Sequence, residues 1–186
     1  MGIALQSDSV SLASHLKSMR VDRGMTLNDL EARSGVSRAT LSRIENAEAS
    51  PTAETLGKLA TAFSVPISRL IAPIDEVFVP LVKGEMQTVW TDAEAGFTRR
   101  VVSPRTGALS FEVIEGTLKP SARISFDSPS VAGQEHHLVL LEGRLRLTVG
   151  GEAHDLRPRD CLRYALYGAT LFEAGEDGAR YILCIR

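Results

Sequence analysis

The sequence predicts a two-domain fold, with an all-α N-terminal domain followed by an all-β C-terminal domain. Up to Pro73, apolar residues recur at the spacing of amphipathic helices, without the alternation that is typical of strands. Beyond Pro73, short apolar runs alternate with Gly, Pro and Asp or Ser breaks every eight to twelve residues, as in all-β barrels. We therefore expect an N-terminal arm, a helical domain, a linker and a β domain over residues 1–10, 11–72, 73–80 and 81–186.

The composition points to the cytoplasm. Hydrophobic residues make up 44% of the chain, but no stretch approaches the ~20 apolar residues of a membrane helix. The N-terminus lacks the basic start and apolar run of a secretory signal. Cys161 and Cys184 lack CxxC spacing, so we expect two buried, reduced cysteines and no disulfide or metal framework. These features predict a cytoplasmic protein with no membrane partner.

The charge pattern allows a nucleic-acid partner on the helical domain. The formal net charge of -2 argues weakly against such a partner, because nucleic-acid binders are often basic overall. However, residues 32–44 contain Arg33, Arg38 and Arg43 and no acidic residue. This stretch predicts a small positive face.

Five helices are expected in the first domain. The last four each begin at a residue suited to a helix start, namely Thr26, Ser37, Thr52 and Pro66. The first two can end in a left-handed conformation at glycines, namely Gly24 and Gly35. Each of the first four carries an apolar stripe for a common core, with members such as Leu16, Leu30, Leu41 and Leu56.

The second and third helices, with a Gly-Val-Ser turn between them, have the parts of a helix-turn-helix motif. The second helix of such a motif enters the major groove and presents its N-terminal side chains to base edges. Here Leu41 and Ile44 are expected to face the core. The polar residues of this helix can then face outward, namely Arg38, Thr40, Ser42 and Arg43.

Residues 11–71 resemble the helix-turn-helix of the phage-repressor (XRE) family. The resemblance rests on R-x-x-R-G, G-V-S, L-S-x-I-E, S-P-T and V-P at the family's spacing. It implies that the start of the third helix reads bases, and the expected DNA-binding set is Thr26, Ser37, Arg38, Ala39, Thr40, Ser42 and Arg43. It also implies a structural ion pair between Arg20 and Glu45. A plain helical bundle with a solvated basic face is the alternative interpretation.

One residue departs from the family pattern. Glu31 stands where relatives usually have Ala, because the two motif helices cross closely there. The long acid must bend outward, or the helix must shift so that Ala32 helps to fill the contact.

The second domain shows barrel-like strands and turns. Residues 144–149 alternate between apolar and polar side chains, which predicts a half-buried antiparallel strand. Turns are expected at Glu142-Gly143, at Gly150-Gly151 and over residues 157–160.

Residues 128–184 resemble the core of the cupin family, a double-stranded β-helix barrel. Many members hold a metal through two histidines and a glutamate, followed by a third histidine. Here Ser130, Ala132 and Thr170 fall on the histidine positions, and His136 falls on the glutamate position. His137 should point to the opposite face of its strand. Three or more converging ligands are therefore missing, and we expect no metal and no cofactor.

The barrel interior remains a candidate ligand-binding site without an obvious catalytic set. The residues that could line it are Ser128, Ser130, His136, Arg163, Tyr164 and Thr170. A buried guanidinium would need an anionic partner, although Arg163 could equally face solvent. His136 could equally be a hydrogen-bonded barrel histidine.

The main functional hypothesis is a transcription regulator that is not an enzyme. A homodimer would bind an approximately palindromic operator in double-stranded DNA, and the cupin domain would bind a small-molecule effector or supply the dimer surface. One alternative is a cupin oxygenase or isomerase tethered to DNA, which would carry a stoichiometric metal. Another is an antitoxin-like or nucleoid DNA-binding protein that senses no ligand.

Overall fold

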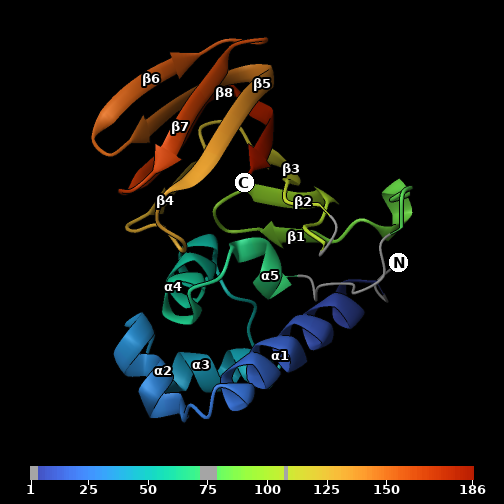
Figure 1. Cartoon of the computed structure of the whole chain (residues 1–186), viewed down its shortest axis with the longest axis vertical. Coiled ribbons are helices and arrows are strands. Elements are labelled where there is room, and N and C mark those ends of the chain that lie inside the picture. The colour runs from blue at the N-terminus through green and yellow to red at the C-terminus, as the bar shows by residue number, and fades with distance from the viewer. Residues whose placement is uncertain (1–3, 72–78, 107–108) are drawn as a thin grey trace.

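Helices and strands occupy opposite ends of the molecule in the computed structural model, which describes residues 4–71, 79–106 and 109–186 (Figure 1). Helices α4 and α5 lie next to the strands, whereas α2 and α3 lie at the far end. The predicted order of an all-α part followed by an all-β part is confirmed. Residues 73–78, which make up most of the expected linker, lie outside the described residues.

The helical part consists of the five expected helices, namely α1 (Ala4–Asp22), α2 (Leu27–Ser34), α3 (Arg38–Glu45), α4 (Ala53–Phe63) and α5 (Ile67–Ile71). The hydroxyls of Thr26, Ser37 and Thr52 accept hydrogen bonds from the first turns of α2, α3 and α4. Gly35 ends α2 at φ 70°. Since α1 begins at Ala4, most of the segment expected as an N-terminal arm belongs to this helix.

The apolar stripes meet in one core. Every helix contributes a leucine that is at most 3% exposed, namely Leu16, Leu30, Leu41, Leu56 and Leu70. Burial of such side chains contributes roughly 1.5–3 kcal/mol each before the cost of ordering the chain. The core therefore fixes how α2 and α3 are presented.

The β part contains a short 3-10 helix and eight strands, namely η1 (Gly84–Met86), β1 (Val89–Asp92), β2 (Phe97–Ser103), β3 (Glu112–Leu118), β4 (Arg123–Phe126), β5 (Gln134–Val149), β6 (Glu152–Leu156), β7 (Cys161–Leu166) and β8 (Thr170–Ile185). All pairings are antiparallel. One layer runs β1-β2-β3-β8-β5-β7 and the other β4-β8-β5-β6, so the long strands β5 and β8 belong to both. This is the barrel that the cupin resemblance implies.

The prediction of a turn at Glu142-Gly143 is wrong, because β5 continues through these two residues. Instead the strand bends there: Gly143 has a φ of 76°, and the pairing with β8 shifts register on both sides of it. Gly178 of β8 has a φ of 77° and lies so close that a Cβ on Gly143 would collide with its carbonyl oxygen. Two glycines thus let both long strands pass from one layer into the other.

The other two turns are as expected. Gly150 and Gly151 both have positive φ, as a tight hairpin between β5 and β6 requires. The turn before β7 is closed by the Asp160 carboxylate, which accepts from the backbone N–H of Arg157 at 2.7 Å. Within the described residues, no helix is long and apolar enough to cross a membrane.

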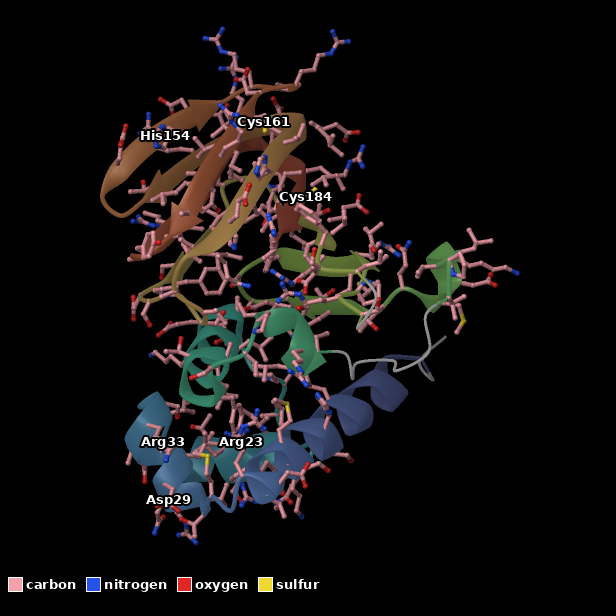
Figure 2. The ribbon with its side chains drawn as sticks, viewed as in Figure 1. Arg23, Asp29, Arg33, His154, Cys161 and Cys184 are labelled. Atoms are coloured by element: carbon pink, nitrogen blue, oxygen red, sulfur yellow. The ribbon has the colours of Figure 1, made fainter. Side chains whose placement is uncertain are left out.

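The expectation that both cysteines are buried is wrong for Cys161. Side chains alternate along β7, so Cys161 and Arg163 face outward and are exposed, while Leu162 and Tyr164 face inward. Cys184 on β8 is half-buried (Figure 2).

The two parts contact each other through specific side chains. Asp92, at the end of β1, is 6% exposed and accepts a hydrogen bond from the backbone N–H of Ala53 at 2.8 Å. It thereby satisfies a free donor at the start of α4. Gly57 of α4 lies against the Phe126 ring of β4, so that a Cβ added there would be 2.7 Å from Phe126 Cδ1. The absence of a side chain at Gly57 allows this close approach.

Candidate nucleic-acid interface and interdomain pocket

The N-terminal half of α3 forms an open polar face at the end of the molecule away from the strands (Figure 1). Arg38, Ala39 and Thr40 are exposed, as is Arg43 one turn later, whereas Ser42 is half-buried. Leu41 and Ile44 on the opposite side are 2% and 3% exposed and anchor the helix. The face therefore has the side-chain division that a helix in the major groove requires.

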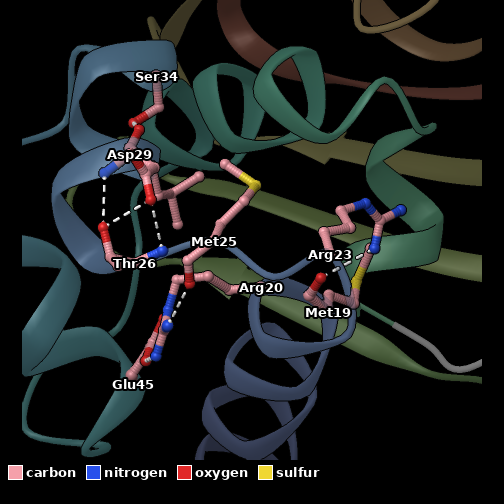
Figure 3. A network of polar contacts seen from close by, with 9 residues as sticks. Met19, Arg20, Arg23, Met25, Thr26, Asp29, Ser34 and Glu45 are labelled. Carbon is pink, nitrogen blue, oxygen red and sulfur yellow. Dashed lines mark hydrogen bonds and ion pairs between the residues drawn. The ribbon is translucent and has the colours of Figure 1, made fainter.

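The polar residues before α2 and α3 are used largely for capping. Thr26 Oγ1 donates to Asp29 Oδ2 at 2.7 Å, and the Thr26 backbone N–H donates to the same oxygen at 2.8 Å (Figure 3). These bonds lower the pKa of Asp29. The hydroxyl and the backbone N–H of Thr26 are therefore both engaged in the cap of α2, although a phosphate contact would need one of these donors. Ser37 Oγ accepts from the Thr40 N–H at 3.2 Å and shares a hydrogen bond with Thr40 Oγ1 at 2.8 Å.

Arg20 and Glu45 form a two-pronged ion pair. Arg20 Nε lies 2.7 Å from Glu45 Oε1, and Nη2 lies 2.8 Å from Oε2 (Figure 3). The third donor, Nη1, reaches the carbonyl oxygen of Met25 at 2.7 Å. The hydrogen bonds to Glu45 raise the pKa of Arg20. One guanidinium therefore ties α1, the turn before α2 and the last residue of α3 together.

Glu31 bends toward the start of α3. Its Oε1 accepts a hydrogen bond from the backbone N–H of Arg38 at 2.9 Å, while Ala32 remains exposed. The long acid at this position thus becomes a second cap for α3, and no helix shift involving Ala32 is needed. It also places a carboxylate beside the residues expected to read bases.

A cavity of about 70 Å³ lies between the barrel and the helical part. Five of the six residues expected to bind a ligand line it, namely Ser128, Ser130, His136, Tyr164 and Thr170. Arg163 does not, which corrects that assignment. It is exposed on the outer face of β7, opposite His137, because the strand alternation turns its neighbour Tyr164 inward.

Sequence reasoning missed Arg99, which lines this cavity from β2. It is 8% exposed, and its Nη2 lies 3.4 Å from Oε1 of Glu112, which is 3% exposed. The second oxygen of Glu112 accepts a hydrogen bond from the Ser68 hydroxyl of α5. The sequence pattern could have indicated that Arg99 faces the interior, since alternation along β2 places it on the same face as Phe97 and Val101.

His136 of β5 is neutral at physiological pH. Burial and the nearby charge of Arg99 lower its pKa to about 4. Its Nδ1 lies 3.1 Å from the hydroxyl of Tyr164, whose pKa is raised by burial. Among the described residues, His136 Nε2 has no hydrogen-bond partner, and neither does Arg99 Nε.

These residues do not fit the metal that many cupins hold. Within residues 4–71, 79–106 and 109–186, no group of three or more His, Cys, Asp or Glu side chains is arranged to bind a metal ion. The guanidinium of Arg99 shares the cavity with His136 and would repel a cation there. The chemistry of the cavity is that of hydrogen-bond donors beside an apolar wall.

Comparisons with known proteins show similarity over most of the chain. A family model described as Helix-turn-helix matches residues 16–70. The chain is 32% identical over 166 residues to the HTH-type transcriptional regulator SutR of Escherichia coli strain K12, covering 89% of this chain and 88% of SutR. It is 40% identical over 62 residues to the HTH-type transcriptional repressor RghR of Bacillus subtilis strain 168, covering 33% of this chain and 46% of RghR.

A solved structure has the same arrangement of both parts. The crystal structure of an HTH_3 family transcriptional regulator from Vibrio cholerae matches with a TM-score of 0.77 and 22% identity, covering 96% of each chain. The similarity in fold therefore includes both the helices and the barrel. The chain belongs to the helix-turn-helix (XRE-family) transcriptional regulators, and its DNA-binding domain is joined to a cupin-type barrel.

Proposed function

We propose that this regulator reads a specific operator through α3 as a homodimer, and that a small-molecule effector binds in the interdomain pocket. The observation that carries the first part is the exposure of Arg38, Ala39 and Thr40 at the start of α3, above a fully buried apolar side. The protein would act on DNA in the cytoplasm.

The side chains of α3 suit different contacts in the groove. A guanidinium can bind guanine through O6 and N7 together, so Arg38 is the proposed base reader. Ala39 can contact a thymine methyl group, and Arg43, one turn later, can reach a base or a phosphate. Ser37, Thr40 and Ser42 can share hydroxyl contacts with the phosphate backbone once their caps are in place. The bonds of Thr26 favour a purely structural role for this residue.

A dimer would make such binding strong enough to select one site. A single helix-turn-helix makes few contacts, whereas two copies bind with a high effective concentration for the second half-site. In a symmetric dimer the two α3 helices would lie about 34 Å apart, one turn of DNA, on an approximately palindromic site. Sedimentation of the full chain with and without operator DNA tests this part.

The test of DNA reading is a gel-shift titration with a duplex selected from a random pool. Arg38→Ala should weaken binding by roughly 5- to 150-fold and relax the base preference at one position per half-site. The control is Arg100→Ala on β2, which removes a half-exposed arginine that pairs with Glu115 in the barrel. Equal losses in both variants, or no duplex preferred over random competitor, would refute the assignment.

We propose further that the pocket binds its ligand without converting it. The partner of Arg99 is the Glu112 carboxylate, whose charge the guanidinium offsets, and the partner of His136 is the Tyr164 phenol, which burial keeps protonated, so neither partner is an activated nucleophile. A DNA-tethered cupin oxygenase or isomerase is the competing function. Metal analysis of protein purified without chelator separates the two, because a stoichiometric transition metal would favour the enzyme.

A further inference from the structure

The walls of the pocket come from both domains. Helices α4 and α5 contribute Gly57, Pro66 and Ile67, and the strands contribute the remaining side chains. A molecule in this cavity therefore touches the DNA-binding domain and the barrel at once.

Two buried nitrogen atoms belong to polar side chains that line the cavity. Arg99 Nε and His136 Nε2 have no hydrogen-bond partner among the residues that the structure describes, although their side chains are only 8% and 7% exposed. Buried polar atoms of native proteins nearly always have a partner, because leaving one unpaired is costly. The Nε of an arginine always carries a hydrogen, so at least one of the two atoms is a donor.

The neighbourhood of His136 makes its free nitrogen a donor as well. Burial keeps the Tyr164 phenol protonated, and its hydroxyl lies 3.1 Å from His136 Nδ1. The imidazole is neutral and carries one hydrogen. When the phenol donates to Nδ1, that hydrogen sits on Nε2. Arg99 and His136, which both line the cavity, then each hold an unpaired donor, and a hydrogen-bond acceptor is what these two donors require.

The charges favour a single negative charge on the ligand. The contact between Arg99 and Glu112 is long, at 3.4 Å, and is made by Nη2, so Nε remains available as a donor to a second oxyanion. Glu112 offsets the charge of Arg99, and a ligand with two or more charges would be repelled by this buried carboxylate.

The rest of the cavity is apolar and small. The side chains facing the remaining space include Ile67, Phe126, Leu166, Phe172, Leu183 and Ile185. A volume of about 70 Å³ leaves room for on the order of five water molecules. This space suits a short hydrocarbon chain of a few atoms.

We propose that the pocket binds a small aliphatic monocarboxylate, with Arg99 Nε and His136 Nε2 donating to its oxygens and α4 and α5 covering its hydrocarbon chain. The proposal rests on the proposed function in one respect only, that the ligand acts as the effector. Ligand binding and DNA binding are therefore measured on the same preparations.

The experiment uses the full chain and butyrate, with ligand-detected NMR titration as the readout. Butyrate should bind saturably with a Kd on the order of 1 mM. Its neutral analogue butyramide and the dianion succinate should each bind at least tenfold more weakly. Arg99→Gln should weaken butyrate binding at least tenfold, and the control Arg163→Gln, on the outer face of β7, should leave it unchanged.

Several results would overturn the proposal. These are equal binding of butyrate and butyramide, no saturable binding up to about 50 mM, or butyrate binding that Arg99→Gln leaves intact. If Arg99→Gln does not fold, two other measurements test the proposal. His136→Phe should weaken butyrate binding, and the unaltered chain should bind butyrate more tightly than butyramide. Loss of butyrate binding with intact operator binding counts against the ligand class alone. Intact butyrate binding with no duplex preference counts against the regulatory function alone.

Discussion

Ser68 of α5 donates its hydroxyl hydrogen to the Glu112 carboxylate of β3, and both residues are buried. The bond joins the DNA-binding domain to the barrel. Glu112 also pairs with Arg99, which lines the pocket, so a continuous series of polar contacts leads from the pocket to α5. A ligand that draws the Arg99 guanidinium toward itself would change the contact of Glu112 with Arg99, and hence the bond that holds α5.

Removing the Ser68 hydroxyl should uncouple the pocket from DNA binding. In the unaltered chain, we expect saturating butyrate to change operator affinity by about fivefold or more, which is a modest coupling between two sites. In Ser68→Ala, butyrate should still bind, but its effect on operator affinity should fall to less than about twofold. Gel shifts with and without butyrate measure both numbers.

The matched control for this variant is Ser125→Ala on β4, an exposed hydroxyl that should leave the coupling intact. If Ser68→Ala retained the full butyrate effect, the route through Glu112 would be wrong. Ile67 and Gly57, which touch the cavity directly, would then be the remaining route.

Breaking the ion pair of Arg20 and Glu45 should destabilise the helical domain strongly. The two side chains are only 12% and 7% exposed, so Arg20→Ala leaves a buried carboxylate without its partner. Loss of one member of a buried pair costs about 3–5 kcal/mol. Denaturant unfolding followed by helical circular dichroism should show this loss, together with loss of operator binding.

The control is Arg146→Ala in the barrel. Its pair with Asp155 has a similar shortest distance, 2.7 Å, but the two side chains are 56% and 72% exposed. Exposed pairs are screened by water and salt and contribute little. Similar losses of stability in the two variants would show that the Arg20 pair is no more buried in solution than the surface pair.

Neutralising Glu31 should tighten DNA binding. Gln at this position can still accept the hydrogen bond from the Arg38 N–H, so the cap of α3 is kept while a negative charge near the phosphates is removed. We expect Glu31→Gln to raise affinity by about two- to fivefold at low salt, and the gain should shrink as salt screens the charge. Gel shifts at two salt concentrations measure this effect.

Glu94→Gln, an equivalent change at an exposed position of the barrel, should leave DNA affinity unchanged. An unchanged or lower affinity in Glu31→Gln would mean that this carboxylate does not face the duplex.

The helical domain could be predicted almost completely from the sequence, because its signals are local. Thr26, Ser37 and Thr52 are capping residues, Gly35 needs a left-handed conformation, and these fix the helix boundaries within a few residues. Only the start of α1 was misplaced, since no cap marks it.

The pocket could be predicted only in part, because its members come together through long-range register. The resemblance to cupins placed His136 among the pocket residues, where it lies, but a one-residue uncertainty on β7 admitted Arg163 together with its inward neighbour Tyr164. Arg99 lies on β2, outside the segment that resembles cupins, so nothing local linked it to His136. Its partners Glu112 and Ser68 lie 13 and 31 positions away in the sequence, and only the fold brings the three together.

The buried imidazole of His136 should make stability depend on pH. Its pKa is about 4 in the folded chain against an ordinary value of 6.5, because burial and the charge of Arg99 disfavour the protonated form. Above pH 6.5 both the folded and unfolded chains hold it neutral, and its contribution to stability is fully present. As pH falls from 6.5 to about 4, His136 becomes protonated in the unfolded chain but stays largely neutral in the folded chain. The free energy of unfolding therefore falls by up to about 3 kcal/mol.

His136→Gln should remove most of this loss, because glutamine does not titrate. Urea unfolding at pH 7, 6 and 5 measures the slope of stability with pH for each protein. The control is His154→Gln on β6, which lies outside the pocket and should keep the slope of the unaltered chain. An identical slope in His136→Gln would show that His136 is protonated as readily in the folded chain as in the unfolded one. Its Nε2 would then be in contact with solvent and not enclosed in the pocket.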